Sequence, residues 1–514
     1  MKHLLLLCFS FFTFSLKSVA QPGYLDITFG LNGSTFTTVG GQWDVIDRMA
    51  ILPDGSILVA GSNHSSFFGD QVGASFMYKL LSDGKVDTSF GIRIYELIPG
   101  KEYVRTIATL PDGKIMMLSD GYSLPNTPHS ILLSRFLPDG SQDISFGQGG
   151  VIFTDFGFNR MYAGEILIMP DSKILLCGVA YATLQSNPKY VLIKLNSDGS
   201  PDASFGTGGI VSSEEFLVSD FHKMAVLPDG KILCAGQMLY NGGSGYSVLL
   251  AKFMADGTPD IDFGNAGVAT HLVAPGFNYV RDFWLTEEGK FYAHGGNSIG
   301  LFTADGSLDL SFGQNGFVAA YGNNMVLTSN GKLLEWTNLP NPSLFDTLIW
   351  IRQLLPDGQP DSSFGVNGEI VTGAVGDGRA GLLDQQGRLV IGGSHFVRAT
   401  IDSLFTDGAV FRFATELSLG IFEESGHTDN TVLVYPNPIG TQARFSFEIK
   451  KATALSLHLM DMNGRLIHDF FTSRNFNTGE QTEDLLFPPG LPPGAYVLVL
   501  KGQERRIATQ IILR

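Results

Sequence analysis

Short apolar segments alternate with tight polar turns along most of the chain. A typical stretch is LPDGKILCAG at residues 227–236, where one apolar run enters a Pro-Asp-Gly turn and a second leaves it. Gly accepts the positive φ that a tight hairpin needs, and Asp hydrogen-bonds its own local backbone. No stretch shows sustained helical periodicity. The pattern predicts short antiparallel strands joined by hairpins.

A second motif, Asp-x-x-Phe-Gly, divides the chain into repeats. Its phenylalanine occurs at Phe29, Phe90, Phe146, Phe205, Phe263, Phe312 and Phe364. Each repeat of about 50–60 residues holds four apolar segments, which is typical of a propeller blade. The fourth segment carries a basic residue at Lys79, Arg135, Lys194, Lys252, Arg352 and Arg412, with Leu301 in the fifth repeat. We expect an all-β, seven-bladed β-propeller over residues 21–418. Whether the chain ends share a blade stays open.

These repeats resemble the delta-60 repeat family of bacterial β-propellers. The resemblance rests on the turn at residues 227–233 and the motif at residues 256–264, and it covers residues 24–416. It implies a propeller in a cell-envelope setting. It supplies no catalytic residues.

The N-terminus has the form of a secretory signal peptide. A short basic start at Met1-Lys2 precedes an apolar run from Leu4 to Leu16 and a small-x-small cleavage site at residues 18–20. The run is too short to span a bilayer. We therefore expect residues 1–20 to be removed, and no transmembrane segment elsewhere.

Charge argues against nucleic acid as a partner. Removing residues 1–20 takes away Lys2 and Lys17 and no acid, so the net charge falls from −16 to −18. A surface of this charge repels nucleic acid and anionic lipid.

Residues 419–430 are polar and acidic and indicate a linker. The tail at residues 431–514 then changes to alternating short strands, which predict a small Ig-like β-sandwich. It resembles the type A C-terminal sorting domain of the type IX secretion system of Bacteroidetes. The matching positions are Tyr435, Pro436, Asn437, Pro438, Asn463, Gly464, Gly494 and Tyr496. The resemblance implies that the protein is exported through the periplasm, with the tail contacting the secretion machinery, and is released or held at the outer cell surface. We expect the protein to be a monomer.

Acid pairs recur in the form Asp-Gly-x-x-Asp, as at Asp139 and Asp143. Such pairs could form a ring of calcium sites. However, two carboxylates fall short of the six to eight oxygens that calcium takes. We expect one Asp to stabilise its turn and the other to cap backbone amides, with no metal and no cofactor.

Two cysteines remain in the mature chain. Cys177 and Cys234 sit seven and six residues after Pro170 and Pro228. Side chains alternate along a strand, so the two thiols should point to opposite faces of neighbouring repeats. We expect two buried free thiols and no disulfide.

Function is expected in the loops between third and fourth segments, which vary in length and should share one rim. Binding commonly resides in variable loops on a rigid scaffold. These loops carry the aromatic residues Phe67, Phe68, Tyr122, Tyr181, Tyr240, Tyr246, Phe345 and Phe396. Exposed, they would suit a glycan or a protein partner; folded back, they would serve as loop core.

No nucleophile or zinc-protease motif appears in the sequence. We therefore expect a non-catalytic binding protein with an unknown glycan or protein ligand. An extracellular hydrolase or lyase acting on polymer at the central channel stays open, because acids and a His from separate blades can assemble there. Carboxylates with a His at the channel would favour the enzyme, whereas an aromatic rim around an empty channel would favour binding.

Overall fold

The computed structural model forms two compact units, one within residues 21–416 and the other within residues 417–514. The model describes residues 23–40, 43–64, 72–97, 101–122, 130–183, 186–213, 219–239, 246–272, 280–322, 324–340, 347–400, 403–415, 432–435, 441–449, 453–461, 466–491, 494–501 and 506–513. The expected signal peptide and the expected boundaries at residues 418 and 431 lie outside these ranges. All regular elements in them are strands, and none of the described segments is a helix long and apolar enough to cross a bilayer.

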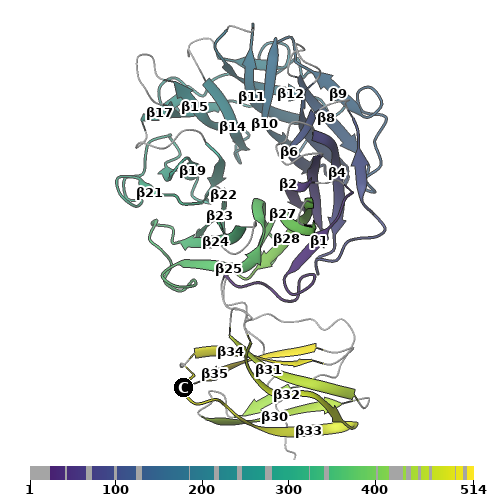
Figure 1. The fold of residues 1–514 in the computed structure, drawn as a ribbon. Coiled ribbons are helices and arrows are strands. Elements are labelled where there is room, and N and C mark those ends of the chain that lie inside the picture. Colours follow the sequence, from purple (N-terminus) through teal and green to yellow (C-terminus); the bar gives the residue numbers. More distant parts are fainter. Residues whose placement is uncertain are drawn as a thin grey trace, which may run out of the picture. The chain divides into compact units, whose positions relative to one another are not determined.

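The described strands of the larger unit form seven groups of four, arranged around a common axis (Figure 1). We call the groups blades 1 to 7 and give their strands from the inner to the outer edge. They are β2 (Trp43–Ile51), β3 (Ile57–His64), β4 (Val72–Leu80) and β5 (Arg93–Tyr95); β6 (Lys101–Thr109), β7 (Ile115–Tyr122), β8 (Ser130–Phe136) and β9 (Val151–Thr154); β10 (Arg160–Ile168), β11 (Ile174–Tyr181), β12 (Lys189–Leu195) and β13 (Ile210–Ser212); β14 (Ser219–Val226), β15 (Ile232–Leu239), β16 (Tyr246–Phe253) and β17 (Val268–Leu272); β18 (Asp282–Leu285), β19 (Phe291–Gly295), β20 (Ser298–Phe302) and β21 (Phe317–Ala319); β22 (Asn324–Leu327), β23 (Leu333–Pro340), β24 (Thr347–Leu354) and β25 (Glu369–Val375); and β26 (Asp377–Leu383), β27 (Leu389–Thr400), β28 (Ser403–Phe413) and β1 (Ser34–Thr37).

Blade 7 is completed by the opposite end of the chain. β1 pairs antiparallel with β28, and Ser34 lies opposite Phe411. The first motif attaches to the same strand, because the amide of Asp26 donates to the carbonyl of Arg412 at 2.7 Å. The N-terminus thus supplies the motif and outer strand of the last blade, so the two chain ends share a blade. Residues after Phe413 therefore need no motif of their own.

Each blade consequently begins at the second apolar segment of a sequence repeat, and the repeated motif forms the turn between its third and fourth strands. In blade 2, the Asp139 carboxylate accepts a hydrogen bond from the Ser141 amide at 2.9 Å. The Asp143 carboxylate does the same with the Ser145 amide at 3.1 Å. Both acids thus hold the turns that contain them, as expected for residues that stabilise local backbone.

The recurrent basic residue packs over the motif phenylalanine. In blade 2, the Arg135 guanidinium lies 4.6 Å from the centre of the Phe146 ring, and its Nε donates to Asp143 at 2.8 Å. Phe146 is fully buried. The Phe146 ring also explains why position 199, in a turn of the next repeat, is a glycine. Gly199 has a φ of +89°, and a Cβ atom there would lie 2.9 Å from the Phe146 ring. Cation–π contacts of this kind also form in blades 1, 3, 4 and 7.

The assignment of Arg352 as the recurrent basic residue of blade 6 is wrong. Gln353, not Arg352, occupies the position of the recurrent basic residue, because its amide donates to Gly368 as that of Lys252 donates to Gly267 in blade 4. Arg352 is one residue out of register. Side chains alternate along a strand, so it faces the other side of the sheet, where it pairs with the buried Glu335.

The core lies between blades, where apolar residues from facing sheets interdigitate. One such cluster contains the two cysteines, which are buried and free as expected. Cys177 on β11 and Cys234 on β15 do occupy opposite faces, but the two faces meet, and both residues are buried in the same cluster between blades 3 and 4. Opposite faces of neighbouring sheets are therefore adjacent rather than separated. Both thiols are free.

The smaller unit is a sandwich of two antiparallel sheets in its described residues. One contains β29 (Val432–Tyr435), β30 (Gln442–Ile449) and β33 (Gly479–Leu486); the other contains β32 (Leu466–Phe476), β31 (Thr453–Asp461), β34 (Gly494–Lys501) and β35 (Arg506–Leu513). Alternate residues of both sheets, such as Phe445, Phe447, Leu457 and Leu498, are buried in a common core. This arrangement confirms the predicted all-β tail.

Candidate functional site

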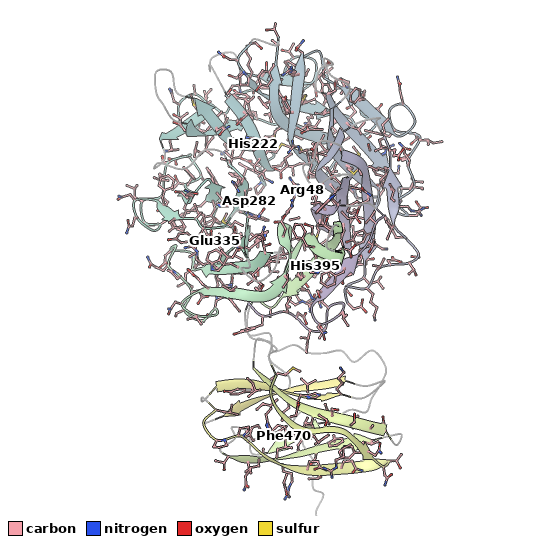
Figure 2. The ribbon with its side chains drawn as sticks, in the orientation of Figure 1. Arg48, His222, Asp282, Glu335, His395 and Phe470 are labelled. Atoms are coloured by element: carbon pink, nitrogen blue, oxygen red, sulfur yellow. The ribbon has the colours of Figure 1, made fainter. Side chains whose placement is uncertain are left out.

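The inner strands of all seven blades line one central cavity of about 790 Å³. Arg48, His222 and Asp282 lie toward the middle of the ring (Figure 2). The lining is rich in charged and amide side chains, in contrast to the apolar clusters between blades. A cavity of this size is within the range of small-molecule sites.

A bulge in the inner strand directs these side chains. The pairing with the second strand shifts by one residue between Ile46 and Arg48 in blade 1, and between Phe221 and Lys223 in blade 4. Corresponding shifts occur in blades 2, 3 and 7. A bulge leaves one residue unpaired and re-aims its neighbours.

In each of the five blades with a bulge, the residue after the bulge lies seven residues before the Gly or Ser that ends the turn of the first hairpin. The same spacing identifies the equivalent residue in blades 5 and 6. We call these positions the axial ring: Arg48, Thr106, Glu165, Lys223, Asp282, Asn324 and Ala380. All except Thr106 line the cavity. The axial ring thus carries two cations, two acids, an alcohol, an amide and a methyl group. This variation contrasts with the uniform turns and motifs of the same repeats.

Two axial acids also connect neighbouring blades. Glu165 accepts a hydrogen bond from the amide of Met224 at 2.9 Å, and Asp282 accepts one from the amide of Met325 at 2.8 Å. Outside the axial ring, Asn338 does the same for the amide of Gly378 at 2.8 Å. The inner strand is the edge of its sheet, so its outward amides need such partners.

Neighbouring charges shift the pKa values of Lys223 and Asp282. The Lys223 ammonium lies 3.2 Å from Glu165. Burial works against the charge on Lys223, but Glu165 and Asp282 outweigh it and raise the pKa of Lys223. Burial likewise opposes ionisation of Asp282, yet the hydrogen bond from His294 and the charge of Lys223 lower the pKa of Asp282. Asp282 is therefore a carboxylate at neutral pH.

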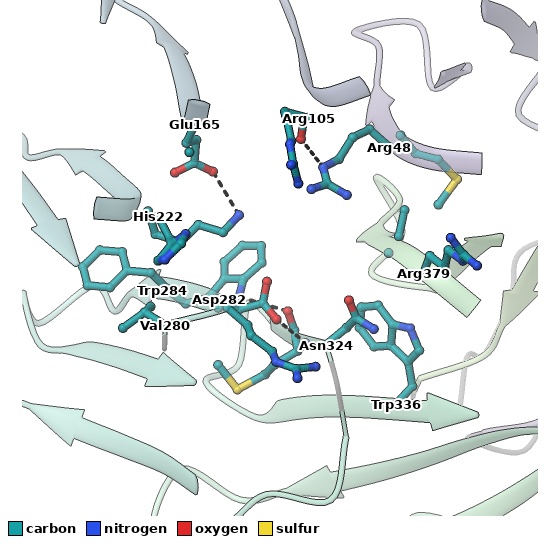
Figure 3. A pocket seen from close by; sticks show the side chains of 18 of the residues that line it. Arg48, Arg105, Glu165, His222, Val280, Asp282, Trp284, Asn324, Trp336 and Arg379 are labelled. Carbon is teal, nitrogen blue, oxygen red and sulfur yellow. Dashed lines mark hydrogen bonds and ion pairs between the residues drawn. The ribbon is translucent and has the colours of Figure 1, made fainter. Parts of the chain in front are cut away.

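Arg48 has a different environment. Its Nη1 donates to the carbonyl of Asp47 at 2.6 Å, and its Nε donates to the carbonyl of Arg105 in blade 2. Burial lowers the pKa of Arg48, although a guanidinium stays charged. In Figure 3 Arg48 and His222 lie on opposite sides of the cavity, and Arg105 and Glu165 come from the neighbouring blades 2 and 3.

The rim aromatics are only partly described. Phe67, Phe68, Tyr240 and Phe345 lie outside the described residues, and only the backbone of Tyr122 and Tyr246 is described, at the end of β7 and the start of β16. Tyr181 and Phe396 lie on the second strands of blades 3 and 7, half-buried. Their rings contact Tyr162 and Trp43 at centroid distances of 6.1 and 5.9 Å. These two side chains therefore pack on neighbouring aromatics at the rim, and the binding role of the set stays a prediction.

The sorting positions are likewise partly described. Pro436, Asn437, Pro438, Asn463 and Gly464 lie outside the described residues, Tyr435 ends β29 and Gly494 begins β34. Tyr496 is buried in the core of the sandwich.

No group of three or more potential metal-ligating side chains gathers anywhere in the described ranges. The acid pairs of the turns contact their own backbone and nearby cations, as Asp143 contacts Arg135. Calcium binding stays untested.

The axial ring was not identified from the sequence, although a signal was present. Aligning the repeats on the turn glycine places Arg48, Glu165, Lys223 and Asp282 in one column. That column changes in charge from repeat to repeat, whereas the turn residue seven positions later is Gly in every repeat but one.

Comparison with known proteins identifies two domain types. Residues 52–90, 170–205 and 227–263 match the domain of unknown function (DUF5122) beta-propeller. Residues 433–514 match the secretion system C-terminal sorting domain. No curated protein matches the chain.

Solved structures with similar chain paths include three from different settings. An α-L-arabinofuranosidase of Fusarium graminearum has a TM-score of 0.38 and 12% identity, covering 77% of this chain and 96% of that chain. An endo-arabinase of Bacteroides thetaiotaomicron has a TM-score of 0.29 and 11% identity, covering 56% and 96%. PorZ of Porphyromonas gingivalis, a surface component of the type IX secretion system, has a TM-score of 0.19 and 10% identity, covering 94% and 100%. Likenesses this distant carry no statement about activity.

The chain therefore joins a DUF5122-type β-propeller to a C-terminal sorting domain of the type IX secretion system, which directs it to the cell surface or the extracellular space.

Proposed function

We propose that the protein is a non-catalytic binding module that takes part of a glycan into the central cavity. The observation that carries this proposal is the axial ring, where the repeats carry different polar side chains on an otherwise uniform scaffold. Repetition elsewhere serves the fold, so variation at one lined position is the expected mark of a ligand site.

The pKa of Asp282 and the hydrogen bonds of both axial acids support binding over catalysis. A carboxyl group that acts as general acid in glycoside hydrolysis needs a raised pKa so that it is protonated at neutral pH. The pKa of Asp282 is lowered instead. Glu165 and Asp282 also satisfy the edge amides of blades 4 and 6. Their oxygens are thus already engaged in holding the ring together.

One observation favours the alternative, a hydrolase or lyase acting in the channel. Glu165, Asp282 and His222 line the same cavity, and carboxylates with a histidine are the combination that the sequence analysis associated with an enzyme. Acids and a histidine from separate blades can act together once a substrate is bound.

Filling the cavity tests the proposal. Ala380 places only a methyl group at its axial position, so Ala380→Phe adds a ring where the ligand would bind. Val366→Phe is the matched control, because Val366 is 77% exposed and does not line the cavity. On a glycan array, we expect full-length Ala380→Phe to lose at least about tenfold in affinity, equivalent to 1.4 kcal/mol, and Val366→Phe to bind normally. Equal binding by the two variants would exclude the cavity.

The enzyme alternative has its own readout. Bound glycans are incubated with the wild-type protein and with Glu165→Gln, and new reducing or unsaturated ends are measured. The binding proposal expects no product from either protein. Product formed by the wild type and lost in Glu165→Gln would establish the alternative.

We infer further that the tail contacts the secretion machinery directly. Deleting residues 431–514 should leave the protein in the periplasm, as measured by cell fractionation. Unchanged export of the truncated chain would contradict this role.

A further inference from the structure

The described lining of the cavity carries more positive than negative side chains. Its cations are Arg379, Arg48 and Arg105 from the adjacent blades 7, 1 and 2, and Lys223 and Arg281 from blades 4 and 5. Its acids are Glu165, Asp282 and Asp377. Five cations therefore line the cavity with three acids, even though the whole chain carries a net charge of −16.

Three of the lining cations each pair with an acidic side chain. Arg379 lies 2.6 Å from Asp377, Arg105 pairs with Asp120, and Lys223 pairs with Glu165. Arg48 differs, because its hydrogen bonds to described residues go to the backbone carbonyls of Asp47 and Arg105. The carboxylates of Asp47, Asp282 and Glu165 act on Arg48 as nearby charges, whereas the two hydrogen bonds orient its guanidinium.

The geometry leaves Arg48 able to bind an anion. A guanidinium has five N–H donors in one plane, and the two hydrogen bonds to carbonyls engage Nε and Nη1. These bonds tie the side chain to blades 1 and 2, so little freedom is lost when a ligand binds. A pre-oriented guanidinium suits the paired oxygens of a carboxylate or sulfate.

The remaining lining indicates the rest of the ligand. Polar groups such as Asn324 and His222 surround the cavity, and the half-buried indole of Trp284 supplies one aromatic surface. The carboxylates of Glu165 and Asp282 can accept hydrogen bonds from hydroxyl groups. This combination suits a polyhydroxylated ring, and a volume of about 790 Å³ limits it to a small ligand or a chain end.

We propose that the central cavity binds a short acidic saccharide and that Arg48 holds its carboxylate or sulfate group. This inference rests on the proposed binding function and specifies its ligand. The net charge of the chain disfavours long polyanions, so a short saccharide should bind better than its polymer.

Calorimetry on the full-length protein tests the inference with a trigalacturonate, a sulfated disaccharide and a neutral trisaccharide of similar size. We expect at least one acidic ligand to bind and the neutral one to bind at least about tenfold more weakly. The carboxylated and sulfated ligands distinguish the two anions. Affinity should fall as salt is raised from 50 to about 200 mM, because screening weakens charge pairing.

Variants assign the effect to Arg48. Arg48→Gln should lose at least about tenfold in affinity for the acidic ligand, and Arg48→Lys should be intermediate, because an ammonium keeps the charge without the planar fork. Arg444→Gln is the matched control: it removes one positive charge from an exposed arginine of the sandwich. Near-ultraviolet circular dichroism establishes that the variants are folded.

The outcomes separate the inference from the proposed function. Neutral saccharides binding as tightly as acidic ones, with sensitivity to Ala380→Phe, would overturn the acidic ligand and leave the cavity as the binding site. Unchanged acidic binding in Arg48→Gln would overturn the role of Arg48. Absence of binding by every saccharide would overturn both proposals.

Discussion

Arg412 donates a hydrogen bond to Asp26 at 2.9 Å, joining two residues that lie 386 positions apart in the chain. Arg388 contacts the same carboxylate at 2.9 Å. The Arg412 guanidinium also lies 4.5 Å from the centre of the Phe29 ring. The N-terminal motif is thus attached to blade 7 by the same contacts that join motif and third strand within a continuous stretch of blade 2.

This closure predicts an asymmetric response to equivalent substitutions. Asp26→Asn and Asp143→Asn each replace a motif carboxylate that pairs with an arginine by a neutral amide. Each should lower the free energy of unfolding by about 3 kcal/mol. Only Asp26→Asn should free a chain end, because the partners of Asp143 lie on neighbouring strands. Limited proteolysis should therefore cut Asp26→Asn faster near the N-terminus than Asp143→Asn, in molecules that urea titration shows to be folded. Identical cleavage patterns would contradict closure through this pair.

Acid should destabilise the propeller in a defined range. Hydrogen bonds and charges from Lys290 lower the pKa of Asp309 to about 2, from a usual value of 3.8. Because the folded-state pKa is depressed, the stabilisation is complete above pH 3.8 and is lost as the pH falls toward 2. Urea midpoints at several pH values should show this loss, and Asp309→Asn should reduce its steepness. An unchanged slope in the variant would show that Asp309 does not contribute.

The buried pair of blade 6 should depend on both partners. Arg352 and Glu335 are 5% and 1% exposed, and Glu335 also accepts from the amides of Tyr321 and Gly322. Arg352→Leu leaves an unpaired buried carboxylate and should cost about 3–5 kcal/mol. Adding Glu335→Gln keeps an acceptor for the amides without the charge. The double variant should be more stable than Arg352→Leu in urea titration; a further loss would mean that charge pairing is not the source of the cost.

The thiols of Cys177 and Cys234 should be unreactive until the protein unfolds. Burial raises the pKa of Cys177 and of Cys234, and the thiolate is the reactive form. Alkylation followed by mass spectrometry should detect no adduct in the folded protein and two in urea. Rapid alkylation of either residue under native conditions would place it outside the cluster between blades 3 and 4.

The sequence by itself determined the strands, the turns, the repeat count and the identity of the tail, because each depends on local rules. Asp139 and Gly140 specify a turn wherever the turn lies, and burial of Phe146 follows from its recurrence. The role of Arg352 was misassigned because register within a strand depends on pairing, and a slip of one residue changes the face.

Three features depended on the tertiary structure. Asp26 and Arg412 meet only when the ring closes, since no local pattern relates residues at opposite ends of the chain. Cys177 and Cys234 share a cluster because facing sheets bring opposite faces together. The axial ring of Arg48, Glu165, Lys223 and Asp282 forms because seven inner strands converge on one axis. Each of these side chains belongs to a different repeat, and only the closed arrangement of the blades brings the set together around one cavity.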